Sequence, residues 1–187
     1  MSQPFIRLIV LERKLASGET ESLEFETGVN LLIGRSNTGK TKWLETFDYL
    51  LGDESDFPLE EIEEGAPGKY ISAAAHLQIG DEKSLHIERR WRERGAKTKI
   101  FVDGNGMNSK EFQQMLLQRL GIPLLNYPKG NPMSGQTWPE LSFRQLLRHI
   151  YRQQLKWGDL AEKQPISDQH ACILQFLGAC RRNISRA

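Results

Sequence analysis

The sequence predicts an α/β fold with a strand, a loop and a helix in succession near its start, and three observations support this prediction. Residues 29–33 form a short, almost wholly apolar run, as in a strand buried in the middle of a sheet. Residues 34–41 read Gly-Arg-Ser-Asn-Thr-Gly-Lys-Thr and satisfy every fixed position of the pattern G-x-x-x-x-G-K-[ST]. Apolar residues then recur at helical spacing from Trp43 to Gly52, where we expect the helix to end. The motif therefore lies between a predicted strand and a predicted helix, which is the context that it requires.

The other predicted strands form an opening pair and a later antiparallel group. Residues 22–26 alternate, with Leu23 and Phe25 expected to face inward, and Gly28 allows a turn after them. Gly95 lies in a turn between the last two strands of the later group. The predicted strands are residues 5–11, 22–26, 70–79, 84–91 and 97–102.

Three helices and one long loop are predicted in the second half of the chain. Asn108 and Glu111 form a capping box before a helix that ends at Gly121. Further helices are expected at residues 140–155 and at residues 168–177, the last ending at Gly178. Residues 123–139 contain four prolines and two glycines, a composition that favours a loop or a mobile flap over a helix or central strand.

Length and composition are typical of one soluble globular domain. The chain has 187 residues, of which 39% are apolar and 26% charged, and we expect one domain at residues 1–178 and a short, disordered or truncated tail at residues 179–187. No apolar run reaches the ~20 residues of a membrane span, and the start lacks the features of a secretory signal. We therefore expect a cytoplasmic protein without membrane contact, in which Cys172 and Cys180 are reduced thiols.

The residue types of the motif are those that bind nucleotide phosphates. Glycines let the backbone approach a phosphate, and the N–H groups of the loop and of the next helix form an anion site. Lys40 is expected to reach the β and γ phosphates as a catalytic residue, and Thr41 to bind Mg²⁺ through its hydroxyl. Asn37 replaces a glycine common in such loops and is compatible with a left-handed backbone. The predicted nucleotide-binding residues are Gly34, Arg35, Ser36, Asn37, Thr38, Gly39, Lys40, Thr41 and Lys42.

The acidic strand that a hydrolytic enzyme of this type needs is missing after Thr41. No run of four aliphatic residues ends there in a pair of acids. Asp103 follows a short apolar run, but its neighbours Gly104, Asn105 and Gly106 favour a hairpin turn. The four histidines are scattered without ligand spacing. We therefore expect the chain alone to bind nucleotide and to hydrolyse it poorly.

Charge is unevenly distributed along a chain of net charge +1. Residues 53–64 hold seven acids and no base, whereas residues 88–99 hold six bases and two acids around Trp91. The basic stretch is able to neutralise a nucleic-acid backbone, and DNA is a possible partner through it. A solvated hairpin face is the alternative, because protein surfaces are generally charged.

The chain resembles the ABC-type heads of SMC and SbcC-like DNA-repair ATPases, including related AAA proteins of bacterial defence. The matching segments are residues 28–34 (Gly-Val-Asn-Leu-Leu-Ile-Gly), residues 120–123 (Leu-Gly-Ile-Pro) and residues 141–154. The resemblance implies a P-loop NTPase fold with a mixed sheet, an antiparallel β group and flanking helices, and it implies ATP rather than GTP. It also implies a Q-loop glutamine that binds Mg²⁺ and the attacking water. Gln153 and Gln154 both match, as catalytic and metal-binding residues, and an ordinary polar helix end is the alternative for either.

Heads of this family consist of two halves, and the resemblance covers only the first. It implies a truncated, split or frame-shifted front half whose partner is a complementary C-terminal half-head or second subunit, within a head-to-head dimer. ATP hydrolysis, and a role in DNA repair, recombination or anti-phage defence, would then need the complete assembly. Two alternatives remain: a stand-alone P-loop kinase or GTPase with residues 123–139 as a lid, and a DNA-binding module with a vestigial P-loop.

Overall fold

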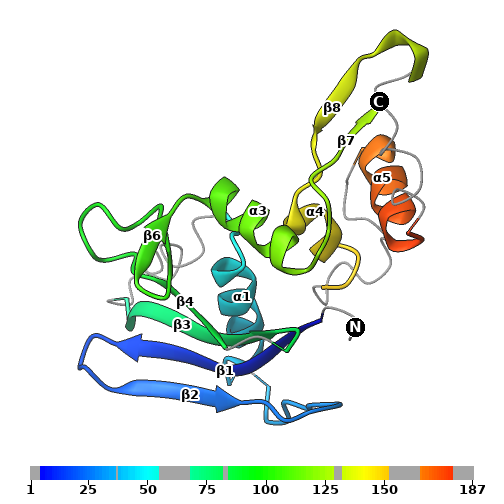
Figure 1. The fold of residues 1–187 in the computed structure, drawn as a ribbon. Coiled ribbons are helices and arrows are strands. Elements are labelled where there is room, and N and C mark those ends of the chain that lie inside the picture. The colour runs from blue at the N-terminus through cyan, green and yellow to red at the C-terminus, as the bar shows by residue number, and fades with distance from the viewer. Residues whose placement is uncertain are drawn as a thin grey trace.

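A computed structural model describes residues 5–36, 38–54, 68–81, 84–128, 132–151 and 165–178. Its centre is a six-stranded sheet in which every neighbouring pair of strands is antiparallel (Figure 1). In sheet order the strands are β2 (Thr20–Glu24), β1 (Ile6–Leu15), β3 (Tyr70–Ile79), β4 (Leu85–Arg89), β5 (Ile100–Val102) and β6 (Asn105–Met107). The α/β class and the antiparallel group predicted from the sequence are both confirmed.

Alternation along the strands gives the sheet one buried face and one polar face. Ala75 pairs with Ile87 across β3 and β4, and both side chains are fully buried. Their sequence neighbours point to the opposite face, because successive side chains of a strand alternate. There His76 lies opposite His86, with ring centroids 4.8 Å apart. The sequence separation of these histidines gave no indication that they meet.

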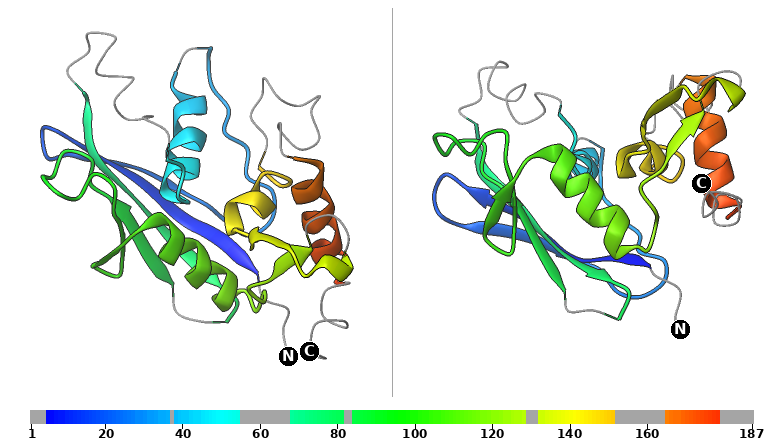
Figure 2. Two further views of the ribbon diagram at one scale, coloured as in Figure 1. Left: turned by 90° about the horizontal axis from the view of Figure 1, so that it is seen from above. Right: turned by 45° about the horizontal axis from the view of Figure 1, so that its top comes forward.

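Two helices cover the buried face of the sheet. They are α1 (Lys40–Leu50) and α3 (Ser109–Arg119), which lie on the same side in all views (Figures 1 and 2). Leu50 and Phe112 are fully buried, and they belong to the same core cluster as Ile87 and Ile100 of the sheet. The predicted capping box of α3 is present, because the Asn108 side chain accepts from the Glu111 N–H and the Glu111 carboxylate accepts from the Asn108 N–H.

The proline-rich stretch is a hairpin rather than an irregular loop. Strands β7 (Asn126–Pro128) and β8 (Thr137–Glu140) pair antiparallel, with a short 3₁₀ helix, Pro132–Ser134, between them. Proline is tolerated because each strand of a two-stranded ribbon has a free edge where a missing N–H costs little. The prediction of a loop or mobile flap for residues 123–139 did not include these two strands, although neither of them is a central strand.

The helix predicted at residues 140–155 begins later and is short. Helix α4 (Phe143–Leu147) starts after Ser142, whose side chain accepts from the Gln145 N–H, and Glu140 belongs to β8 instead. The Gln145 amide then donates to Asp168 at the start of α5 (Ile166–Phe176) at 2.8 Å. Within the described ranges no helix is long and apolar enough to cross a membrane.

Candidate functional site

The motif of residues 34–41 forms a loop that leads directly into α1. Gly39 has φ 77°, a left-handed conformation that favours glycine, and it immediately precedes Lys40, the first residue of the helix. No side chain caps this helix end, so the first-turn N–H groups are not used by a capping residue. The first turn closes with a bond from the Trp43 N–H to the Gly39 carbonyl at 3.3 Å. The loop therefore presents main-chain donors at the positive end of a helix dipole.

The Lys40 ammonium group lies inside this loop. Its Nζ donates to the Gly34 carbonyl at 3.0 Å and to the Thr38 hydroxyl at 3.2 Å, and it also bonds the Arg35 carbonyl. The Thr38 hydroxyl donates to the same Arg35 carbonyl at 2.9 Å. A Cβ at Gly34 would lie 3.4 Å from the Thr38 Oγ1 and 3.9 Å from the Lys40 Nζ, so Gly34 lies directly beside both groups. The loop thus holds one positive charge within a ring of its own backbone.

The residues present fit a phosphate group and a magnesium ion. The donors are main-chain N–H groups and an ammonium, which are the groups that bind phosphate oxygens. Thr41 is exposed at the start of α1 and offers a hydroxyl oxygen, a ligand type that Mg²⁺ accepts. Lys42 forms an ion pair with Glu45 at 3.2 Å, so its side chain lies along the helix. Arg35 and Ser36 are exposed beside the loop, and Asn37 lies outside the described residues.

The structure describes Asp103 but not the two candidate Q-loop glutamines. Gln153 and Gln154 lie outside the described residues, and their predicted role in metal binding and catalysis stays a prediction. Asp103 lies in the tight turn between β5 and β6 with φ 47°, and its carboxylate accepts from the His86 N–H at 3.0 Å. The hairpin interpretation of Asp103 agrees with this geometry, which leaves the carboxylate bonded to the backbone of β4.

The segment before the loop is extended and exposed, which corrects the prediction of a buried strand at residues 29–33. Val29, Leu31 and Ile33 expose 89%, 77% and 86% of their surfaces, and no strand of the described chain pairs with this segment. The Asn30 side-chain amide bonds the backbone of Glu26: it accepts from the Glu26 N–H and donates to the Glu26 carbonyl, both at 2.9 Å. The apolar pattern is that of a strand, but a buried strand also needs neighbours on both sides.

The basic stretch of residues 88–99 is not a uniform charged face. Arg89 is buried against α1, and its Nη1 donates to the carbonyls of Tyr49 and Asp53 at 2.8 and 2.6 Å. Arg90 pairs with Glu88 at 2.7 Å, which cancels much of its charge. Burial lowers the pKa of Arg89, although the charge of Asp53 opposes the shift. Arg89 is therefore unavailable to a nucleic-acid backbone, and only the exposed members of the stretch remain for the predicted DNA contact.

A cluster of aromatic and charged side chains fixes the first turn of α1 to the sheet. The Arg13 guanidinium lies 3.7 Å from the Trp43 ring centroid and 4.3 Å from that of Tyr70. Glu21 accepts hydrogen bonds from Arg13 at 2.9 Å and from Lys69 and Tyr70, each at 2.7 Å. Cation–π contacts of this kind contribute roughly 0.5–2 kcal/mol each. The helix end that carries the P-loop is thereby held in place.

Acidification is expected to weaken this cluster through Glu21. Burial alone raises the pKa of Glu21, but hydrogen bonds from Lys69 and Tyr70 and the charges of Lys69 and Arg13 lower it from 4.5 to about 2. A lowered pKa contributes stability that is present above about pH 4.5 and is lost as the pH falls toward 2. Urea melts at pH 6 and pH 3 should show a smaller acid-induced loss in Glu21→Gln than in wild type. The exposed Glu19→Gln is the control, and equal losses in all three proteins would contradict the prediction.

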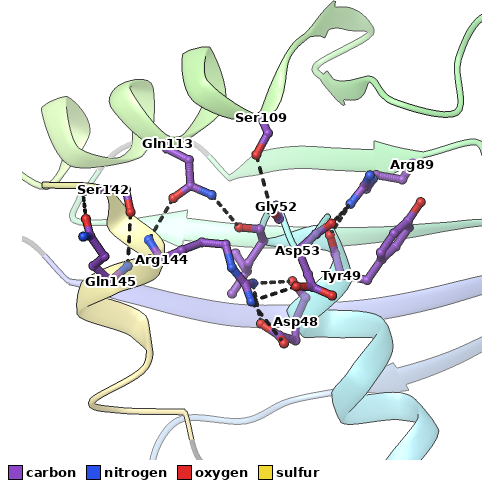
Figure 3. A network of polar contacts seen from close by, with 11 residues as sticks. Asp48, Tyr49, Gly52, Asp53, Arg89, Ser109, Gln113, Ser142, Arg144 and Gln145 are labelled. Atoms are coloured by element: carbon purple, nitrogen blue, oxygen red, sulfur yellow. Dashed lines mark hydrogen bonds and ion pairs between the residues drawn. The ribbon is translucent and has the colours of Figure 1, made fainter. Parts of the chain in front are cut away.

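At the other end of α1, four side chains from β4, α3 and α4 donate hydrogen bonds to the last backbone carbonyl groups (Figure 3). We call these four residues, Arg89, Ser109, Gln113 and Arg144, the α1 clamp. Ser109 donates to the Gly52 carbonyl at 3.3 Å, and the Gln113 amide to the Leu51 carbonyl at 3.2 Å. A side chain at Gly52 would collide with Gln113, because a Cβ would lie 2.4 Å from its Nε2. The carbonyls held in this way belong to Asp48, Tyr49, Leu51, Gly52 and Asp53. No local pattern in the sequence predicts the clamp, because its members come from three separate elements.

A cavity of about 630 Å³ lies beside the α1 clamp, between α3, α4 and the hairpin β7–β8. Gly52 and Asp53, at the C-terminal end of α1, line it together with Lys110, Gln113 and Arg148. No residue of the loop 34–41 lines it. This cavity is therefore separate from the candidate phosphate site.

Comparisons with known proteins found a similarity to one DNA repair protein over about half of this chain. The DNA repair protein RecN of Aquifex aeolicus (strain VF5) is 23% identical over 100 residues, which are 54% of this chain and 16% of that protein. The similarity supports the resemblance to SMC-type ATPase heads. The chain matches only a small part of RecN's length.

A solved structure from work on ATP-driven dimerization and DNA-stimulated activation of SMC ATPases aligns with 83% of this chain and 97% of its own, at a TM-score of 0.42 and 14% identity. No protein-family model matches the chain.

Proposed function

We propose that this chain is the ATP-binding front half of an SMC- or SbcC-like ATPase head. The observation that carries the proposal is the loop of residues 34–41, in which the Lys40 ammonium, at the N-terminus of α1, donates to the Gly34 carbonyl and the Thr38 hydroxyl. The similarity to RecN supports the choice of this family over other P-loop proteins. In this proposal Lys40 binds the β and γ phosphates, and Thr41 holds Mg²⁺, which neutralises phosphate charge when bound.

Hydrolysis in this proposal requires a complementary segment. The sequence after Thr41 lacks an acidic strand, and Asp103 is engaged with the backbone of β4. The exposed segment 29–33 supports the same view, because no strand of the described residues packs against its apolar side chains beside the P-loop. The complement would supply the acidic strand and the signature motif, with Gln153 or Gln154 completing the metal site. A head-to-head dimer acting in DNA repair, recombination or defence is the proposed assembly.

The test compares binding with turnover by the purified chain. A fluorescent ATP analogue should bind in the presence of Mg²⁺, while phosphate release by the isolated chain should stay near background. Robust turnover by the chain alone would favour a stand-alone kinase or GTPase. DNA binding with a steep salt dependence, in a chain that does not bind the analogue, would favour the vestigial P-loop.

A further inference from the structure

The α1 clamp lies at the opposite end of α1 from the P-loop. Helix α1 has 11 residues, starts at Lys40 of the loop and ends at Leu50, so its ends are separated by about 15 Å. A helix held at both ends moves as one body, because its internal hydrogen bonds resist bending. A change at the loop therefore acts on whatever is bonded to the last turn.

Arg144 is the member of the clamp that belongs to α4. Its guanidinium donates to the Asp48 carboxylate at 2.5 Å and to the Asp48 carbonyl at 3.1 Å, and it reaches the Asp53 carboxylate at 3.1 Å (Figure 3). The main-chain N–H of Arg144 donates to the Gln113 side-chain oxygen at 2.8 Å. Arg144 thus bonds the end of α1 with its side chain and α3 with its backbone.

The burial of this ion pair makes it stronger than a surface pair. The side chains of Arg144 and Asp48 are only 18% and 11% exposed. A partly desolvated, multiply bonded arginine–carboxylate pair resists separation, whereas an exposed pair contributes little. Removal of the guanidinium would leave the Asp48 carboxylate buried without its cation. The end of α1 and α4 therefore move together as long as Arg144 is present.

Helix α4 is the described element that precedes the two glutamines in the chain. It ends at Leu147, and Gln153 and Gln154 follow six and seven residues later in the sequence.

We propose that Arg144 is a positioning residue that couples the P-loop to α4, so that nucleotide binding at the start of α1 stabilises α4 through the α1 clamp. This inference rests on the proposed function, because it requires that the loop binds nucleotide. Coupling between two sites is reciprocal. Loss of Arg144 therefore weakens nucleotide binding by the same factor by which nucleotide stabilises the bonded state of α4.

Hydrogen exchange with and without Mg²⁺ and ATP tests this coupling in wild type, Arg144→Met and Arg148→Met. Arg148 is the matched control, because it lies one turn further along, is exposed, and makes no hydrogen bond to α1 among the described residues. In wild type, nucleotide should slow exchange in both α1 and α4, the latter about fivefold or more. Arg144→Met should keep the protection of α1 and lose that of α4, while Arg148→Met should behave as wild type. A purely structural role of Arg144 would raise exchange equally with and without nucleotide.

The outcomes separate the inference from the proposed function. Nucleotide that leaves α1 unprotected in wild type would overturn both. Two results would overturn the coupling alone, if nucleotide protects α1. In the first, α4 is equally protected in wild type and Arg144→Met. In the second, α4 is protected in neither protein. If Arg144→Met does not fold, Asp48→Asn and Arg144→Lys replace it, since each weakens the ion pair and keeps the shape of the site. Both should then show partial loss of protection in α4, and full protection would overturn the inference.

Discussion

Replacement of Lys40 by alanine is expected to abolish detectable nucleotide binding. The Lys40 ammonium is the positive side chain inside the loop, where it bonds the Gly34 carbonyl and the Thr38 hydroxyl. A hydrogen bond to a charged group contributes about 1.5–3 kcal/mol, so loss of two phosphate contacts should raise Kd roughly 100-fold or more. Titration with a fluorescent ATP analogue and Mg²⁺ measures this change, and circular dichroism establishes that the variant is folded.

Lys42→Ala is the matched control for Lys40→Ala, because both lysines lie in the first turn of α1. The Lys42 ammonium pairs with Glu45 at 3.2 Å, and an exposed pair of this type contributes at most a few tenths of a kcal/mol. Alanine keeps the main-chain N–H of residue 42, so binding should change less than about twofold. An equal loss in both variants would show that general positive charge, rather than the position of Lys40, supports binding.

Features that depend on neighbouring residues in the sequence were predictable. The helix after Gly39, the capping box of Asn108 and Glu111, and strand β3 at residues 70–79 are set by local pattern, and the structure has all three. The turn at Asp103 is equally local, since glycine and asparagine follow it directly. The candidate phosphate site belongs to this class, because a loop of eight consecutive residues forms it.

Features that depend on distant residues were not predictable from one sequence. Arg144 and Asp48 are 96 positions apart, and neither stands out among the many charged residues of the chain. Arg89 was grouped with a basic surface stretch, although alternation along β4 places it on the buried face with Leu85 and Ile87. That alternation was the available signal, and it indicates an inward-facing arginine with carbonyl or carboxylate partners.

The exposed segment 29–33 is expected to make the isolated chain associate with itself. Val29, Leu31, Leu32 and Ile33 are all exposed apolar side chains of this short segment. The segment carries no charge, and an uncharged, exposed, extended run is a template for strand addition by a second copy. Sedimentation velocity should show larger species of the wild-type chain that grow with protein concentration.

The double variant Leu31→Asp, Ile33→Asp should sediment as a monomer, because two like charges on adjoining copies would face each other when strands pair in register. Ile166→Asp is the control: Ile166 is also 84% exposed, but it lies on α5 and far along the chain from the segment. Association that persists in the double variant and disappears in Ile166→Asp would assign the contact to α5. A wild-type chain that sediments as a compact monomer with a cooperative melt would contradict the expectation altogether, and would mean that residues 29–33 need no partner strand.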